Sequence, residues 1–265
     1  MHANFLDPYQ EGASPVHRLD ARIKLALVIA FIFTSALTPA GAWPIFILLF
    51  SLILSAELLS DLGIGFYMKR ALLALPFVLA ALPLLVTVDG VALLPLPLGL
   101  SITQQGLERF LSISLRSWIS VQAAILLAST TTFPDILRAM RAMGLPRLMV
   151  AIIGLMWRYL FVMVDEVLRM LRARTARSGE SESPERRTGG TIFWRSQVAG
   201  GMAGSLFLRS LERSDRIYHA MLARGYDGEI RSLPQPGLRP VDWLVLFIVL
   251  LFLLSLLVLS RILWG

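Results

Sequence analysis

Two tripeptides place a single arginine between small residues, each at the end of a long helical pattern. They are Ala176-Arg177-Ser178 and Ala223-Arg224-Gly225. Small flanks let a partner approach the backbone closely, and a projecting guanidinium can form a forked ion pair with a carboxylate. An arginine beside a glycine at a helix end is also common capping chemistry. One tripeptide therefore indicates little, whereas one on each of two neighbouring helices favours a docking site.

The other residue types that could do chemistry do not form a site. The chain has no cysteine and three histidines, which excludes disulfides, iron–sulfur clusters and thiolate zinc sites. His2, His17 and His219 have no spacing that gathers the several ligands a metal ion needs. The sequence contains no G-x-x-x-x-G-K-[ST] phosphate loop and no hydrolase or metalloprotease motif. We predict a non-catalytic chain that itself binds no metal ion and no cofactor.

Composition indicates a membrane protein. Of 265 residues, 56% are hydrophobic and 16% are charged, whereas soluble domains have about 45–50% apolar and about 25% charged residues. The net charge of +7 would by itself suit nucleic acid or an anionic membrane surface. Long apolar runs favour the lipid bilayer, and we expect no nucleic-acid partner.

Five apolar runs are predicted to cross the membrane, since a crossing needs roughly 20 mostly apolar residues. They are residues 23–37, 43–59, 71–88, 110–130 and 241–259. Asp20 should cap the first run, and Pro76 and Pro83 should kink the third. Arg116 in the fourth should snorkel outward or face another helix. Basic residues before the first run predict a cytoplasmic N-terminus, and residues 91–100 should form an outer loop or re-entrant piece.

The centre of the chain is predicted to form a hairpin of two long helices, at about residues 148–176 and 191–224, on the cytoplasmic side. The first could dip into the bilayer, because residues 151–164 are mostly apolar. Gly200 and Gly204 could mark a close helix crossing, although ordinary packing would also explain them. The predicted fold is all-α, with a cytoplasmic segment 1–19, transmembrane helices 20–133, coupling helices 134–230 and a C-terminal transmembrane helix 231–265.

The sequence resembles the T component of energy-coupling factor transporters, especially the CbiQ type of cobalt importers, over nearly its whole length. The resemblance rests on residues 14–24 (SPVHRLDARIK), 145–146 (LP), 156–160 (MWRYL), 165–166 (DE), 176–178 (ARS) and 220–228 (AMLARGYDG). Ser178 departs from the family, in which glycine is frequent at that place. Serine is also small, so we expect docking to survive.

The resemblance implies a role as the coupling subunit of an importer in the inner membrane. Arg177 and Arg224 would end helices that sit in grooves of two ATP-binding cassette subunits. ATP and Mg²⁺ would be bound by those subunits, and the substrate by a CbiM-like membrane subunit. Cobalt is the substrate that the resemblance favours, followed by nickel and then a vitamin.

Other functions remain open on the residues alone. Membrane subunits of other ABC importers use one cytoplasmic docking loop, and residues 140–148 could be mistaken for it. A secondary transporter should show repeated halves and ionisable residues near the membrane midplane. No repeat is visible, and Glu57 lies near the end of its run. A membrane enzyme is the least favoured class, since no catalytic set falls within the runs.

Overall fold

The computed structural model describes residues 8–95, 101–177, 191–228 and 237–264. It separates into two compact units, Met1–Gly144 with Gln235–Gly265, and Leu145–Pro234. Both units are helical, apart from one short pair of strands in the first. The prediction of an all-helical polytopic membrane protein is confirmed. The predicted boundaries between transmembrane and cytoplasmic parts stay predictions.

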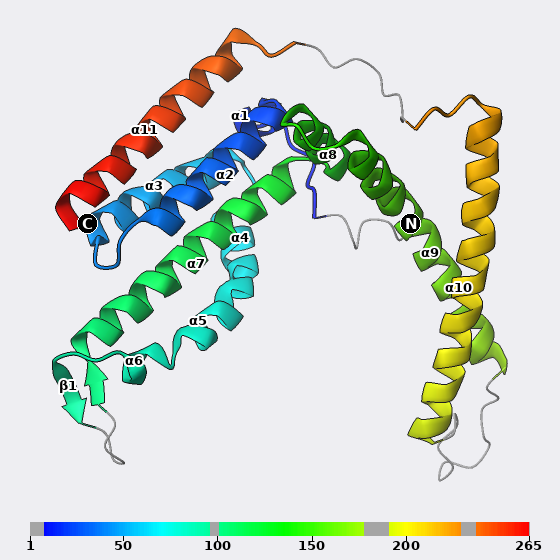
Figure 1. Cartoon of the computed structure of the whole chain (residues 1–265), viewed down its shortest axis with the longest axis horizontal. Coiled ribbons are helices and arrows are strands. Elements are labelled where there is room, and N and C mark those ends of the chain that lie inside the picture. Colours follow the sequence, from blue (N-terminus) through cyan, green and yellow to red (C-terminus); the bar gives the residue numbers. More distant parts are fainter. Residues whose placement is uncertain (1–7, 96–100, 178–190, 229–236, 265) are drawn as a thin grey trace. The chain divides into compact units, whose positions relative to one another are not determined.

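The first unit is arranged around the long helix α7, which packs against α2, α3, α4, α5 and α6 (Figure 1). Helix α2 also packs against α8 and α11. In chain order the elements are α1 (Pro15–Arg18), α2 (Ala21–Leu37), α3 (Trp43–Leu59), α4 (Ile64–Ala71), η2 (Leu72–Ala74), α5 (Leu75–Ala81), α6 (Leu84–Thr87), β1 (Ala92–Pro95), β2 (Ser101–Thr103), α7 (Gln104–Thr130), α8 (Phe133–Ala142) and α11 (Pro240–Trp264).

The third apolar run is broken where prolines lie. Pro76 is in the first turn of α5, and Pro83 is the N-cap of α6. Proline has no N–H for the i−4 carbonyl and clashes with the preceding turn, so the chain restarts its helix at each one. The kinks predicted from Pro76 and Pro83 are therefore confirmed.

The segment predicted as an outer loop contains an antiparallel pair of strands. Ala92 lies opposite Thr103 and Pro95 opposite Ser101, with an irregularity between residues 92 and 94. These strands could not be predicted from the sequence, because two prolines and a glycine in residues 91–100 favour a loop. Residues 96–100, which include Pro97 and Gly99, lie outside the described residues.

Four described helical stretches are long and apolar enough to cross a membrane: Ile64–Thr87, Gln104–Thr130, Arg147–Arg177 and Pro240–Trp264. Trp43–Leu59 is a shorter apolar helix. Both α2 and α3 have 17 residues, a length of about 26 Å at 1.5 Å per residue. Arg147–Arg177 was predicted to lie on the cytoplasmic side. Its composition alone fits either the cytoplasmic side or the membrane.

Polar contacts join α2 to α7 near both ends of α2. Asp20 caps α2, as predicted, by accepting a hydrogen bond of 2.8 Å from the Arg22 amide. Lys24 is 7% exposed and donates from Nζ to the Thr130 carbonyl, at the end of α7, over 2.8 Å. Arg116 donates to the Thr38 carbonyl after α2 over 2.7 Å. Arg116 therefore faces another helix, the second of the two predicted alternatives.

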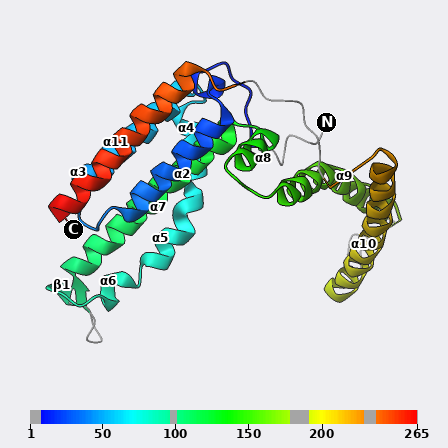
Figure 2. The same ribbon diagram turned by 45° about the horizontal axis from the view of Figure 1, so that its top comes forward.

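The second unit consists of α9 (Arg147–Arg177) and α10 (Ile192–Ala223), both within one residue of the predicted ranges. Figures 1 and 2 show the two helices crossing. Few side chains of α9 and α10 are buried, and α10 has no fully buried residue among those described. Its exposed apolar side chains include Phe207, Leu211 and Tyr218 on one face. Much of the surface of this unit therefore remains available to a partner or to lipid.

Candidate functional site

Arg177 is the last residue of α9 and is exposed to solvent. Ala176 before it is also exposed, so nothing described covers the backbone at this end. Within the described residues the Arg177 side chain has no hydrogen-bond or ion-pair partner. Ser178, the third residue of the predicted docking tripeptide, lies outside the described residues.

Arg224 caps α10, and Gly225 turns the chain away from it. Gly225 has φ +78°, and its N–H donates to the Leu222 carbonyl over 2.9 Å. The next N–H, of Tyr226, donates to the Met221 carbonyl over 3.0 Å. These two hydrogen bonds form a Schellman motif, which satisfies carbonyls that a helix end leaves unpaired. The tripeptide therefore has a capping role, and the motif leaves Ala223 and Arg224 exposed.

Replacement of Gly225 by alanine should loosen this end of α10. A left-handed backbone costs a residue with a Cβ about 1 kcal/mol, and no described atom lies within 4 Å of that Cβ to offset the strain. Amide hydrogen exchange at residues 225 and 226 should become faster. Gly204→Ala is the matched control, because that glycine is helical and equally open. It should stabilise α10 by up to about 1 kcal/mol. Unchanged exchange in Gly225→Ala would contradict the capping role.

Among the described residues, the close helix crossing expected at Gly200 and Gly204 is not found. A Cβ built on either glycine meets no described atom within 4 Å beyond its own helix and chain neighbours. Helices α9 and α10 are joined further along, where Glu166 accepts from Arg209 of α10 over 2.6 Å and from Arg169 of its own helix. The reason for the difference is that long side chains make this contact, with Arg209 reaching Glu166, and not the small residues at 200 and 204.

Glu166 is the central residue of this crossing. Its side chain is 14% exposed, although the two arginines that bind it are 61% and 59% exposed. A carboxylate that receives two guanidinium groups is held more firmly than in a single surface pair. From the sequence, Glu166 stands out only as part of the family resemblance at residues 165–166. Its partner lies 43 residues away, so no local spacing could have indicated the pair.

The two predicted docking arginines lie on opposite sides of the crossing. Arg177 follows Glu166 by eleven residues and Arg224 follows Arg209 by fifteen, which correspond to about 17 Å and about 22 Å of helix. Because α9 and α10 run in opposite senses (Figure 1), their C-terminal ends point away from each other. The structure therefore presents two separate exposed arginines, and no single site contains both.

A basic groove of about 720 Å³ runs between the second half of α9 and the first half of α10. Its charged lining residues are Glu166, Arg169, Arg174, Arg177 and Arg209. Four cations against one carboxylate give this groove a positive field, which suits an acidic partner. Arg177 is thus one member of a larger positive surface.

In the described part of the chain, no group of three His, Cys, Asp or Glu side chains could hold a metal ion. The histidines therefore form no metal site there. His17 lies 2.7 Å from the Ser14 hydroxyl and 3.1 Å from the Gln10 carbonyl. It therefore fastens the segment before α2. His219 is exposed on α10 beside the ring of Tyr218. His2 lies outside the described residues.

Comparison with known proteins gives one matching family. Residues 12–236 match the family model CbiQ, described as cobalt transport protein. An uncharacterized protein of Methanocaldococcus jannaschii is 27% identical over 245 residues, 90% of this chain and 80% of that protein. The energy-coupling factor transporter transmembrane protein EcfT of Listeria innocua is 28% identical over 240 residues, 86% of each. A putative fused cobalt transport protein CbiMQ of Methanocorpusculum labreanum is 24% identical over 256 residues, 92% of this chain and 40% of that protein.

Proposed function

Because the chain belongs to the CbiQ family of cobalt transport proteins, we propose that it is the coupling subunit of an energy-coupling factor importer. It is a multi-pass membrane protein. The Listeria innocua relative is named a transporter transmembrane protein, and the Methanocorpusculum labreanum relative is named a putative fused cobalt transport protein. We place it in the inner membrane with its N-terminus in the cytoplasm. The observation that carries the proposal is the pair of exposed arginines, Arg177 and Arg224, at two separated helix ends.

In this proposal each arginine docks into one of two ATP-binding cassette subunits. Those subunits bind ATP and Mg²⁺ and hydrolyse the nucleotide, while this chain is not catalytic. Their closure moves the two helix ends, and the Glu166–Arg209 pair makes α9 and α10 move together. The motion passes to a CbiM-like membrane subunit, which releases its substrate inside. A change of this kind is a rigid-body rotation about an interface.

Cobalt is the proposed substrate, because cobalt is named by the family and by the fused relative. That relative's name joins CbiM and CbiQ in one chain, which supports a CbiM-like partner here. Nickel and vitamins are the alternatives, and uptake assays with each cargo in the assembled complex would distinguish them.

Co-purification tests the docking role. The tagged chain would be expressed with candidate ATPase subunits, as wild type and as the Arg177→Ala/Arg224→Ala double variant. We expect the wild type to retain ATPase and the double variant to lose it. Equal retention by both would reject the two arginines as anchors and would favour the single docking loop of other ABC importers, around α8 and Gly144. If the wild type retains no ATPase, a secondary transporter becomes the better explanation.

A further inference from the structure

Two cavities of the first unit meet at Lys24, where α2 begins and α7 ends. One has a volume of about 260 Å³ and is lined mainly by apolar side chains of α2, α3, α7 and α11. The other has a volume of about 340 Å³ and is lined mostly by polar residues. Leu19, Lys24 and Thr130 line both cavities. An apolar compartment and a polar compartment are therefore adjacent, each large enough for part of a small molecule.

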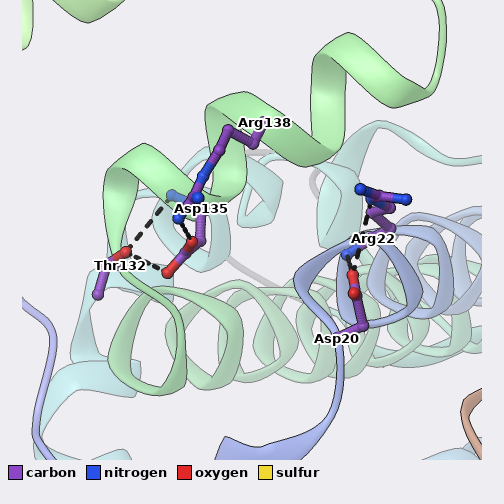
Figure 3. A network of polar contacts seen from close by, with 5 residues as sticks. All are labelled: Asp20, Arg22, Thr132, Asp135 and Arg138. Carbon is purple, nitrogen blue, oxygen red and sulfur yellow. Dashed lines mark hydrogen bonds and ion pairs between the residues drawn. The ribbon is translucent and has the colours of Figure 1, made fainter. Parts of the chain in front are cut away.

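The charges around the polar cavity are balanced. Its cations Lys24 and Arg138 are accompanied by the carboxylates of Asp20 and Asp135. Arg138 pairs with Asp135, which also accepts from the Thr132 hydroxyl over 2.5 Å. Figure 3 shows these contacts at the start of α8 and those of Asp20 with Arg22 at the start of α2. A balanced polar cavity suits a zwitterion better than a purely anionic group.

Two buried groups in the wall have unused hydrogen-bonding capacity. Thr131 lines the polar cavity, is 4% exposed, and its hydroxyl has no partner among the described residues. The ammonium of Lys24 has three donors, and its one hydrogen-bond acceptor in the described part of the chain is the Thr130 carbonyl. A buried polar group without a partner is costly, so such groups in a cavity wall indicate a polar ligand.

We propose that the two cavities hold one phospholipid, with a zwitterionic phosphatidylethanolamine headgroup in the polar cavity and the start of an acyl chain in the apolar cavity. The phosphate would lie near Lys24 and Arg138, and the ammonium near Asp20 and Asp135. The adjoining cavities require an amphiphile, and phospholipids are the amphiphiles that surround a membrane-spanning chain. This site is separate from the arginines of the docking proposal and does not depend on them.

Native mass spectrometry of the purified full chain, titrated with phosphatidylethanolamine in detergent, tests the site. Ala56→Phe fills the apolar cavity and should abolish specific binding. Ala36→Phe, at an exposed position near the other end of α2, is its control. Arg138→Gln should weaken binding about tenfold, the effect of one charge-assisted hydrogen bond. Arg141→Gln, on the same helix but outside the cavity lining, is the second control.

The proposal is supported if both cavity variants lose affinity while both controls keep it. Equal binding by all five proteins would overturn it, because the lipid would then be bound only at the general surface. Equal or tighter binding of phosphatidylglycerol would overturn the zwitterionic assignment. Competition by glycerophosphoethanolamine at the same concentration as the lipid would overturn the role of the apolar cavity. Because Arg138 is 42% exposed, its variant should fold and keep the test decisive if Ala56→Phe does not fold.

Discussion

Replacing either Arg177 or Arg224 by alanine should release one ATPase subunit and sharply reduce metal uptake. Each arginine lies at its own helix end, so each single variant should lose one anchor and keep the other. Removing one partner of a buried charge pair costs about 2–5 kcal/mol, which is about 30-fold or more in affinity. The measurements are the ATPase stoichiometry of the purified complex and the uptake of radioactive cobalt by cells.

Two further variants separate docking from general charge. Arg172→Ala removes an exposed arginine from the body of α9 and should leave both measurements unchanged. Arg177→Lys and Arg224→Lys keep the charge but cannot reproduce the forked pairing of a guanidinium. Each should therefore retain only part of the affinity for its ATPase subunit. Full activity in both single alanine variants would show that the helix ends are not anchors.

Replacing Lys24 by methionine should lower the free energy of unfolding by about 2–3 kcal/mol, the value of a hydrogen bond to a charged group. The change removes the donor that joins the start of α2 to the Thr130 carbonyl at the end of α7. It also leaves a buried carbonyl without that partner. In detergent the thermal midpoint should fall by roughly 5–10 °C, given about 2–4 °C per kcal/mol for a chain of this size.

Lys69→Met is the matched control for this prediction. Lys69 is exposed in the last turn of α4, and surface substitutions usually change stability by less than about 0.5 kcal/mol. The control should therefore keep the wild-type midpoint. If Lys24→Met unfolds at the wild-type temperature, the contact between α2 and α7 does not contribute to stability.

The helices could be predicted from the sequence because their signals are local. Apolar runs, the Asp20 cap and the breaks at Pro76 and Pro83 each depend on residues within one or two turns. The ends of α9 and α10 were predictable for the same reason, since Arg177 and Gly225 mark them. The placement of α9 in or outside the membrane was not predictable, because an apolar helix face suits lipid and a protein partner equally well.

The tertiary contacts were not predictable, because they join residues that are distant in the sequence. Lys24 binds the Thr130 carbonyl across 106 residues, and Glu166 binds Arg209 across 43. Gly200 and Gly204 suggested a crossing point from spacing alone. The observed contact between α9 and α10 is instead at Glu166. It could not be predicted, since a long-range ion pair leaves no periodic pattern in the sequence.

The ion pair at Glu166 divides the hairpin into two lever arms of unequal length. If α9 and α10 turn together about this point, the displacement of each end grows with its distance from the pair. A rotation of 10° would move Arg177 by about 3 Å and Arg224 by about 4 Å, given arms of about 17 and 22 Å from the helical rise. If each helix end holds one ATPase, as proposed, the ATPase on α10 would travel about a third further than the ATPase on α9 in each cycle, so two identical ATPases would still work against unequal mechanical loads.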